Sequence, residues 1–315
     1  MVLFLALQKD YYEMRKFILL LFLSAVTALP RAYEDPVIRN SFPVGQGSKG
    51  DSSSVLIVGG REAQPGEFPW QVSLQYISGG VLKHNCGGAI IDETHIVTAT
   101  HCGYASGYQV VAGAHNIQQN ETTQQRIPAL KFIPHPRFNL FLKNDIAVII
   151  LSSPLVFNDR VKPLRLPPAN VNPVGQLCVV SGWGNANPSG GNPPMYPDEL
   201  RAVNLTITSN EECQERLSGS IVDETMVCAH DNAGGKATCG GDSGGPLVCS
   251  DATGPYLLGV VSWGRSPCGQ PEFPSVLSRE FNTPLKNRGI LKALRTSWQR
   301  HLIEKANSKK TLSGF

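Results

Sequence analysis

The residues best suited to chemistry in this chain lie in the segment Cys239-Gly240-Gly241-Asp242-Ser243-Gly244-Gly245-Pro246. A serine among glycines, directly after an acid, is ill suited to a packed core, because glycine adopts backbone angles that other residues resist and leaves room for a ligand. The backbone N–H groups of Gly241 and Ser243 can point into one small space, where they would stabilise the oxyanion formed when a carbonyl is attacked. Taken alone, the segment is also compatible with a plain glycine-rich turn.

Two other segments supply what a serine nucleophile needs. A serine hydroxyl is weak at neutral pH and requires a nearby base, which in turn requires an acceptor that holds its tautomer and stabilises its cation. His101 lies in the segment Val97-Thr98-Ala99-Thr100-His101-Cys102, and Asp145 in Asn144-Asp145-Ile146-Ala147-Val148. Either residue alone is more often structural, but together with Ser243 they predict nucleophilic acyl transfer.

On these motifs the chain resembles the trypsin/chymotrypsin family of serine proteases, over residues 57–277. The resemblance implies an all-β fold of two six-stranded antiparallel β-barrels with the active site in the cleft between them, followed by a short C-terminal helix. It places His101 and Asp145 on the first barrel and Ser243 on the second. Thr100 departs from the family, which usually has alanine before the catalytic histidine, and we expect activity to survive this change. The other matching motifs are Ile57-Val58-Gly59-Gly60, Pro69-Trp70-Gln71-Val72-Ser73-Leu74, Cys86-Gly87-Gly88, Ser181-Gly182-Trp183-Gly184 and Ser262-Trp263-Gly264.

The strand pattern agrees with that fold class. Short β-branched or alternating runs, broken by Gly, Asn or Pro, are typical of an all-β sandwich or barrel. A Pro-rich stretch at Lys162–Pro173 predicts a connector between a first barrel at about 57–165 and a second at about 174–285. The expected strands are Val72–Tyr76, Ala89–Ile91, Thr94–Ala99, Gln109–Ala112, Ile146–Leu151, Leu177–Ser181, Pro246–Cys249 and Tyr256–Trp263.

Composition and charge exclude other classes. With 17% charged and 41% hydrophobic residues, the chain is globular rather than disordered. Its net charge of +3 comes from the C-terminal part, because residues 286–315 carry 8 basic and 1 acidic residues, whereas residues 57–285 carry 14 basic and 19 acidic ones. Nothing in the body predicts a nucleic-acid surface.

The N-terminal part is typical of an exported precursor. A basic start at Met14-Arg15-Lys16, an apolar run at Phe17–Val26 and small residues before Ala28 predict a signal peptide at 1–28, with Met14 as a possible true start. The run is too short to span a membrane comfortably. Residues 29–56 are rich in Pro, Gly and Ser, and we interpret them as a propeptide rather than a plain linker.

The motif that begins at Ile57 resembles a family N-terminus that cleavage creates. In the family, the freed amino group pairs with the acid before the nucleophile, here Asp242, and this pair orders the loop that carries Gly241 and Ser243. The residue before the cut is Leu56 rather than Lys or Arg. We therefore expect a chymotrypsin- or elastase-like protease, including another copy of this chain, to activate the zymogen.

All eight cysteines lie in the protease-like body. An even number in an exported chain implies disulfides, and spacing alone leaves on the order of a hundred pairings open. No Cys-x-x-Cys or paired Cys/His spacing predicts a metal site. The resemblance implies the pairs Cys86–Cys102, Cys178–Cys249, Cys213–Cys228 and Cys239–Cys268.

The resemblance also implies a substrate pocket. Its base is Ala237, where members that cleave after Lys or Arg carry an acid, so a cationic side chain would be buried unpaired. Thr238 and Ser275 line the walls, Gly264 leaves the mouth open, and Ser262-Trp263-Gly264 binds the substrate backbone as an added strand. An uncharged, open pocket favours large apolar residues. Ser275 replaces a common glycine and shortens the pocket, which keeps an elastase-like preference for smaller residues open.

The remaining expectations concern partners and modification. The positions that would carry carboxylates in a calcium loop are Ala114 and Gln124, so no metal or cofactor is expected. Asn120 and Asn204 begin sequons for glycans. The protease domain should extend over 57–300, with a helix near Trp298, followed by a solvated basic tail at 301–315.

We therefore expect a secreted, monomeric serine endopeptidase, made as a zymogen, that cleaves proteins after large apolar residues and meets protein inhibitors, with no nucleic acid or membrane partner. Two alternatives stay open: elastase-like specificity, and a catalytically silent homologue that acts as a binding protein. An esterase of another fold is disfavoured, because the Gly-x-Ser-x-Gly elbow of such enzymes expects a different order of catalytic residues.

Overall fold

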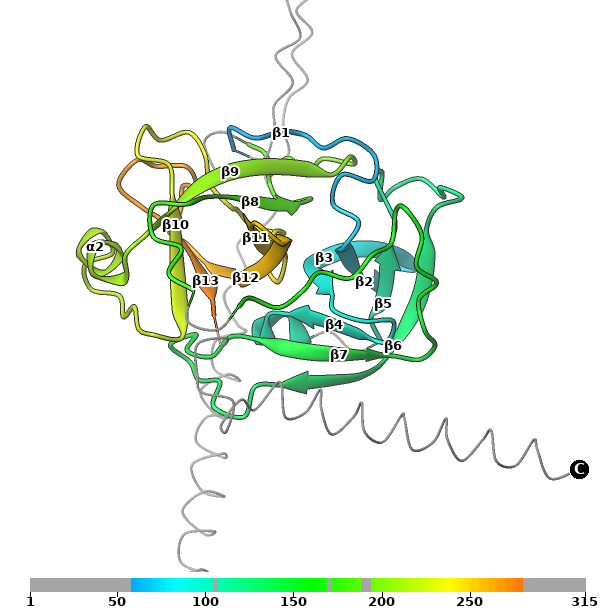
Figure 1. Ribbon diagram of the computed structural model, residues 1–315. Helices are drawn as coiled ribbons and strands as arrows, with labels where there is room; N and C mark the ends of the chain where they lie inside the picture. The colour runs from blue at the N-terminus through cyan, green and yellow to red at the C-terminus, as the bar shows by residue number, and fades with distance from the viewer. Residues whose placement is uncertain (1–57, 105–106, 169–170, 188–193, 280–315) are drawn as a thin grey trace, which may run out of the picture. The chain divides into compact units, whose positions relative to one another are not determined.

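The computed structural model describes residues 58–104, 107–168, 171–187 and 194–279. These residues form two β-barrels side by side (Figure 1). The expected signal peptide, propeptide, C-terminal helix and basic tail lie outside the described residues, as do Leu56 and Ile57. Within the described residues, no helix has the length and apolar character needed to cross a membrane.

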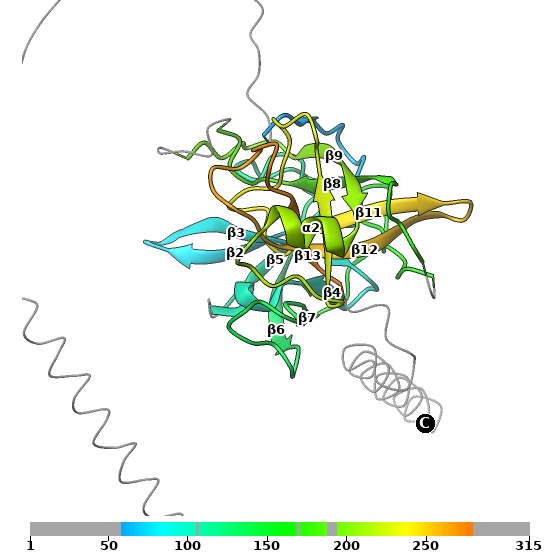
Figure 2. The same cartoon turned by 90° about the vertical axis from the view of Figure 1, so that its left-hand side faces the viewer.

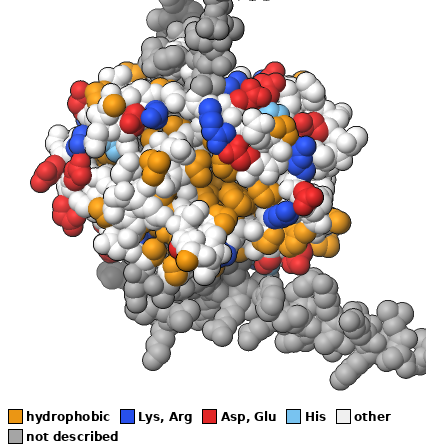
Figure 3. All heavy atoms as spheres, turned by 45° about the horizontal axis from the view of Figure 1, so that its top comes forward, with side chains coloured by type: hydrophobic (Ala, Val, Ile, Leu, Met, Phe, Trp, Pro, Cys, Tyr) orange, Lys and Arg blue, Asp and Glu red, His pale blue; other side chains and the backbone are white. Residues whose placement is uncertain are grey.

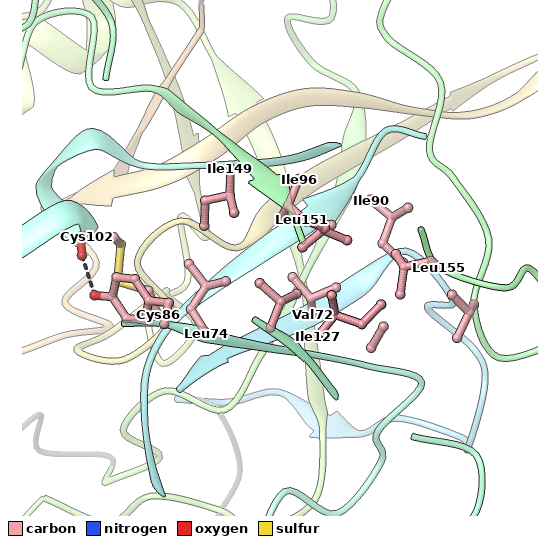
Figure 4. Close-up of a cluster of buried hydrophobic side chains, with 14 of the residues drawn as sticks. Val72, Leu74, Cys86, Ile90, Ile96, Cys102, Ile127, Ile149, Leu151 and Leu155 are labelled. Atoms are coloured by element: carbon pink, nitrogen blue, oxygen red, sulfur yellow. Dashed lines mark hydrogen bonds between the residues drawn. A yellow bond between two sulfur atoms is a disulfide. The ribbon is translucent and has the colours of Figure 1, made fainter. Parts of the chain in front are cut away.

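The first barrel closes in the order β2-β3-β4-β7-β6-β5, and every neighbouring pair is antiparallel. Its alternating apolar residues form one dry cluster that includes Val72, Leu74, Ile96 and Ile149, each fully buried (Figure 4). Burial of each such side chain stabilises the fold by about 1.5–3 kcal/mol. The strands are β2 (Gln71–Ser78), β3 (Val81–Ile90), β4 (His95–Thr98), β5 (Gln109–Ala112), β6 (Gln125–Pro134) and β7 (Ala147–Leu151).

The second barrel contains six strands in the order β9-β10-β13-β12-β11-β8, closed by a further pairing of β8 with β9. A two-residue strand, β1 (Arg61–Glu62), adds to the outside of β9, so this early segment pairs with the second barrel rather than the first. The other strands are β8 (Leu177–Gly182), β9 (Arg201–Thr208), β10 (Met226–His230), β11 (Pro246–Asp251), β12 (Gly254–Trp263) and β13 (Ser275–Ser278).

The segment between β7 and β8 bonds to both barrels, as expected of a connector. Leu164 donates its backbone N–H to Ile90 O of the first barrel at 2.8 Å. The next residue, Arg165, accepts from Leu257 N of the second barrel at 2.9 Å. These two bonds fix the relative position of the walls that carry the candidate site.

One α-helix, α2 (Asn210–Arg216), occurs among the described residues. It begins after Ser209, whose hydroxyl accepts from Glu212 N at 3.1 Å, and it carries acids in its first turn. Both features stabilise a helix N-terminus. The disulfide between Cys213 and Cys228 fastens the helix to β10.

The surface carries charges of both signs. On the face in Figure 3, basic and acidic side chains alternate around a central apolar area. The hairpin of β2 and β3 extends from the body (Figure 2) and exposes Ile77 and Val81 at its tip.

Candidate active site

The imidazole of His101 lies just after the first barrel's β4, in a short 3-10 helix (Thr100–Tyr104). The Cys86–Cys102 disulfide ties this helix to β3, and the hydroxyl of Tyr108 donates to Cys102 O (Figure 4). The two sulfur atoms and one ring nitrogen of His101 lie within 4.8 Å of one another. Because the sulfurs are bonded to each other, this cluster positions the histidine and is no thiolate metal site.

Asp145 is fully buried and serves as the acceptor for His101. Its Oδ2 lies 2.6 Å from His101 Nδ1, and its Oδ1 accepts from His101 N at 2.9 Å. The hydroxyl of Ser262, on β12 of the second barrel, donates to the same Oδ2 at 2.5 Å. Because the carboxylate accepts at Nδ1, the neutral imidazole carries its proton there and leaves Nε2 free to accept one.

Thr100, where the sequence departs from the family, is accommodated without strain. Its hydroxyl donates to Ile146 O at 2.7 Å, which links the helix of His101 to the residue directly after Asp145. The added hydroxyl is therefore satisfied, as a buried polar group needs to be.

Ser243 lies in a tight loop between the two barrels. Its carbonyl accepts from Gly87 N of β3 at 2.7 Å, and Gly244 donates to Val261 O of β12 at 2.7 Å. Gly244 has a φ of +76°, and a Cβ there would lie 2.2 Å from the hydroxyl oxygen of Thr98, at the end of β4. The glycine therefore lets the loop press against the strand that leads to His101.

The neighbouring Asp242 is 1% exposed. Its carboxylate accepts from Gly184 N at 2.8 Å and from Cys239 N at 2.9 Å. A Cβ on Gly184 would lie 2.3 Å from this carboxylate, so the Ser181-Gly182-Trp183-Gly184 motif provides a glycine where the acid needs space. Burial raises the pKa of Asp242 to about 6, because the backbone bonds only partly offset the loss of water.

The first described residues, Val58 and Gly59, contact the loop that precedes this acid. Val58 is 2% exposed, and its carbonyl accepts from Ala237 N at 3.3 Å. Gly59 has a φ of +69°, and a Cβ on it would lie 2.0 Å from Gly235 O. The residues that directly follow Ile57 are thus packed against the loop that precedes Asp242.

Sequence reasoning missed His84, on β3. Its Nε2 lies 2.9 Å from Gly241 O, and its Nδ1 lies 2.8 Å from the hydroxyl of Ser73. Desolvation lowers the pKa of His84 to about 4, so the ring is neutral at pH 7. Since Nε2 must then donate to the carbonyl, Nδ1 accepts from Ser73, and the ring holds the peptide between Gly241 and Asp242.

A cavity of about 380 Å³ adjoins Ser243. Four of the six predicted substrate-binding residues line it, namely Thr238, Ser262, Trp263 and Gly264. The two others, Ala237 and Ser275, are 5% and 4% exposed and do not line it. The hydroxyl of Thr238, which lines the cavity, donates to Ser275 Oγ at 2.9 Å, so Ser275 lies directly behind this part of the cavity wall.

The structure contains the four disulfides that the resemblance implies: Cys86–Cys102, Cys178–Cys249, Cys213–Cys228 and Cys239–Cys268. Cys239 and Cys268 both line the cavity beside Ser243, so their bond joins two of its walls.

The loop around residues 114–124 is closed by a side-chain amide. Gln124 Nε2 donates to Asn116 O at 3.0 Å and to Gln119 O at 2.9 Å, and lies 3.3 Å from the Glu121 carboxylate. Glu121 also accepts from His115 N at 2.7 Å. The amide of Gln124 thus donates to carbonyl and carboxylate oxygens of the kind that bind hard cations such as calcium.

The two sequon asparagines, Asn120 and Asn204, both have exposed side chains. Asn204 lies on β9, where outward residues alternate with buried ones. Glycan occupancy at both sites stays a prediction.

The chain is similar in sequence to known proteins. Residues 57–283 match the family model described as Trypsin. The chain is 38% identical to Kallikrein-1 of Mus musculus over 238 residues (72% of this chain, 86% of the relative). It is 40% identical to Trypsin-1 of Astacus astacus over 227 residues (70% of this chain, 93% of the relative). It is 43% identical to Trypsin-3 of Salmo salar over 233 residues (74% of this chain, 91% of the relative).

Proposed function

This chain belongs to the trypsin family and is a serine endopeptidase, and we propose that it is a secreted zymogen whose active form cleaves proteins after apolar residues. The single observation that carries the proposal is that His101, Asp145 and Ser262 are linked by hydrogen bonds beside a cavity that Ser243 lines and that no acidic side chain of the described residues lines.

In the proposed reaction, Ser243 is the nucleophile. His101 Nε2 takes the hydroxyl proton as Ser243 Oγ attacks the peptide carbonyl, while Asp145 holds the imidazole and stabilises its cation. The N–H groups of Gly241 and Ser243 bind the oxyanion. His101 then protonates the leaving amine, and water repeats the sequence to release the acid.

The preference for apolar residues is supported by the cavity lining. Within the described part of the chain, no acidic side chain lines the cavity, and Ala237 at the predicted base of the pocket is uncharged, so a lysine or arginine side chain would lose its hydration without gaining a partner. Two of the relatives are named trypsins, but this chain has no acid at the position of Ala237. The proposed substrates are proteins with a large apolar residue, such as Phe, Tyr, Leu or Met, directly before the scissile bond.

A second preference, for smaller side chains, is favoured by one contact. Ser275 bonds to Thr238 of the cavity lining, so its side chain fills space beside the cavity that glycine would leave empty. This elastase-like alternative predicts faster cleavage after Ala or Val than after Phe.

Activation is proposed to proceed by cleavage between Leu56 and Ile57. Asp242 is buried with backbone N–H partners and no cation among the described residues, which is the environment in which a freed amino group of Ile57 would be stabilised. The packed position of Val58 supports this proposal, since its neighbour Ile57 is the residue that would be released. We infer secretion from the signal-like N-terminus and the four disulfides.

The proposed partners are protein substrates and protein inhibitors that occupy the same cleft, and the enzyme is proposed to act as a monomer. The silent-homologue alternative is disfavoured by the intact set of His101, Asp145 and Ser243 and by the close loop packing around them.

The test is a cleavage assay of protein released at Ile57, against peptides that differ only in the residue before the scissile bond. Cleavage after Phe, Tyr or Leu that is absent in Ser243→Ala supports the proposal. Fastest cleavage after Ala or Val selects the alternative pocket preference. Cleavage after Arg or Lys alone would overturn the apolar preference, and no cleavage by folded protein would favour the silent homologue.

A further inference from the structure

We propose that Arg265 makes this enzyme prefer substrates with an acidic side chain at the third or fourth position before the scissile bond. The proposal rests on the proposed function, since it assumes that a peptide lies along β12 with its scissile bond at Ser243. It adds a charge preference that the residues predicted for the base and walls of the pocket, Ala237, Thr238 and Ser275, do not provide.

Arg265 belongs to the same cavity as the nucleophile. Both Arg265 and Ser243 line it, and Arg265 follows Gly264 at the start of the loop between β12 and β13. This loop lies beside α2 (Figures 1 and 2), and Arg216 of α2 donates to Pro271 O at 3.3 Å. The side chain of Arg265 therefore lies on the wall of the cavity that the second barrel provides.

Two contacts hold the guanidinium of Arg265 in place. Its central carbon lies 5.1 Å from the centroid of the Phe273 ring, a cation–π contact. Its Nη2 donates to Ser218 O at 2.7 Å, on the turn that follows α2. A side chain fixed in this way loses little conformational entropy when it binds a ligand, which favours recognition.

The charge of Arg265 is not neutralised by the described part of the protein. Among the described residues that line the cavity, Arg265 is the one charged side chain. No described Asp or Glu forms an ion pair with it, whereas Arg61, Arg165 and Arg216 each have a carboxylate partner. Arginine presents five N–H donors in a planar fork that matches a carboxylate, and Ser218 O takes one of them.

The register of an added strand sets the position along the substrate. An extended peptide that pairs antiparallel with Ser262-Trp263-Gly264 places its first residue before the scissile bond near Ser262, because the hydroxyl of Ser262 contacts the catalytic Asp145. Each further enzyme residue then faces one earlier substrate residue, since both strands rise by about 3.3 Å per residue. Gly264 faces the third position and Arg265 the fourth.

The chain's own activation site lacks this acid. The third and fourth residues before the bond that follows Leu56 are Ser54 and Ser53. The proposal therefore predicts that the active enzyme cleaves its own zymogen more slowly than a peptide with Glu at either position.

The test uses the protein released at Ile57 and pairs of peptides with Leu before the scissile bond and either Glu or Gln at the third or fourth position. We expect kcat/KM to be about threefold to tenfold higher for the Glu peptide at low salt, through a lower KM, and the ratio to fall toward one as salt rises. The ratio of kcat/KM for the Glu peptide to that for the Gln peptide should fall to about one in Arg265→Gln and below one in Arg265→Glu. In Arg265→Lys it should stay above one but below the value of the unaltered enzyme.

Arg160→Glu is the matched control, because it changes the net charge as much as Arg265→Glu does. The side chain of Arg160 does not line the cavity. This variant should leave the Glu-to-Gln ratio unchanged. Because the ratio is measured within each enzyme, a general loss of stability or activity in a variant does not alter it.

Three outcomes would overturn the proposal. Equal cleavage of both peptides by the unaltered enzyme overturns the role of Arg265 but leaves the proposed function intact. A ratio that persists in Arg265→Gln assigns the preference to another group. Absence of cleavage after Leu in both peptides is the failure of the proposed function itself, and the Arg265 proposal falls with it.

Discussion

The Nε2 atom of His84 lies 2.9 Å from the carbonyl oxygen of Gly241, so a side chain on β3 of the first barrel holds the loop that carries Ser243. The ring is neutral at pH 7 because desolvation lowers its pKa to about 4, and Ser73 donates to its other nitrogen. A contact from the first barrel therefore holds the peptide between Gly241 and Asp242, next to the proposed oxyanion donors.

We predict that His84→Ala lowers kcat by about tenfold or more and changes KM by less than about twofold. Removal of a whole oxyanion donor lowers kcat by about 10²–10³-fold. Displacement of the loop that carries the donors should lower kcat less than that. Steady-state kinetics with one peptide substrate measures both constants.

Ser73→Ala is the graded control for this prediction, because it removes the partner of Nδ1 and leaves Nε2 free to donate to Gly241. It should lower kcat less than His84→Ala does. An unchanged kcat in folded His84→Ala would mean that the loop holds its shape without this contact.

A second prediction concerns Asp242 and pH. Burial raises the pKa of this carboxyl from 3.8 to about 6, so the folded uncut chain binds a proton that the unfolded chain has already lost. The free energy of unfolding of the uncut chain should therefore fall by roughly 3 kcal/mol as pH rises from about 4 to about 6. It should stay at this lower value above pH 6. The sign is opposite to that of an ion-paired carboxylate, whose folded pKa is depressed.

Cleavage at Ile57 should remove this loss, because the new amino group pairs with the charged form of Asp242. Urea unfolding at pH 4.5 and 7.5, in uncut and cut forms that both carry Ser243→Ala, checks the difference between the forms. In Asp242→Asn, the two forms should respond alike to pH. Equal pH dependence of both forms with Asp242 intact would contradict the proposed activation.

A third prediction follows from Gln124. Its amide bonds to Asn116 O and Gln119 O and lies close to the Glu121 carboxylate, so the loop is closed without a cation. Chelation of calcium should therefore leave the melting temperature of the natural chain unchanged. Gln124→Glu brings two carboxylates together, which should lower the melting temperature until millimolar calcium restores it.

Gln118→Glu is the matched control for the calcium experiment, because Gln118 is an exposed residue of the same loop. It should give no calcium response. A melting temperature of the natural chain that drops when calcium is chelated would show that another site holds the cation.

A fourth prediction concerns Ser275. Replacing it with glycine removes the hydroxyl that bonds to Thr238 and frees space beside the cavity. Ser275→Gly should raise kcat/KM for substrates with Phe, Tyr or Trp before the scissile bond, relative to Val, by several-fold. Ser275→Ala should shift the ratio less, since it keeps the Cβ. A ratio that is the same in all three enzymes would mean that Ser275 does not limit the pocket.

The sequence indicated the strands that alternate clearly or carry continuous apolar runs, such as β5 and β7, to within a residue or two. It did not indicate β6, because Ile127 is the one buried side chain among its ten residues and Pro128 and Pro134 interrupt the pattern. The helix α2 was also missed, although Ser209 before its first residue and Glu212 in its first turn form a capping signal.

The catalytic candidates were predictable because their local motifs are specific, whereas the residues that position them were not. His84 has no surrounding motif, and its role arises from a contact 157 positions away in the sequence. The hydroxyl of Ser262 was expected only to line the substrate strand, and its bond to Asp145 required the two barrels to be placed together.

In the proposed mechanism, Ser243 forms an acyl-enzyme with help from His101. The most direct test mixes protein released at Ile57 with a slowly hydrolysed ester, quenches it with acid, and maps the added mass by mass spectrometry. We predict one acyl group on Ser243, formed much more slowly in His101→Ala and absent in Ser243→Ala. An adduct on another residue, or none while peptides are still cleaved, would contradict the proposed mechanism.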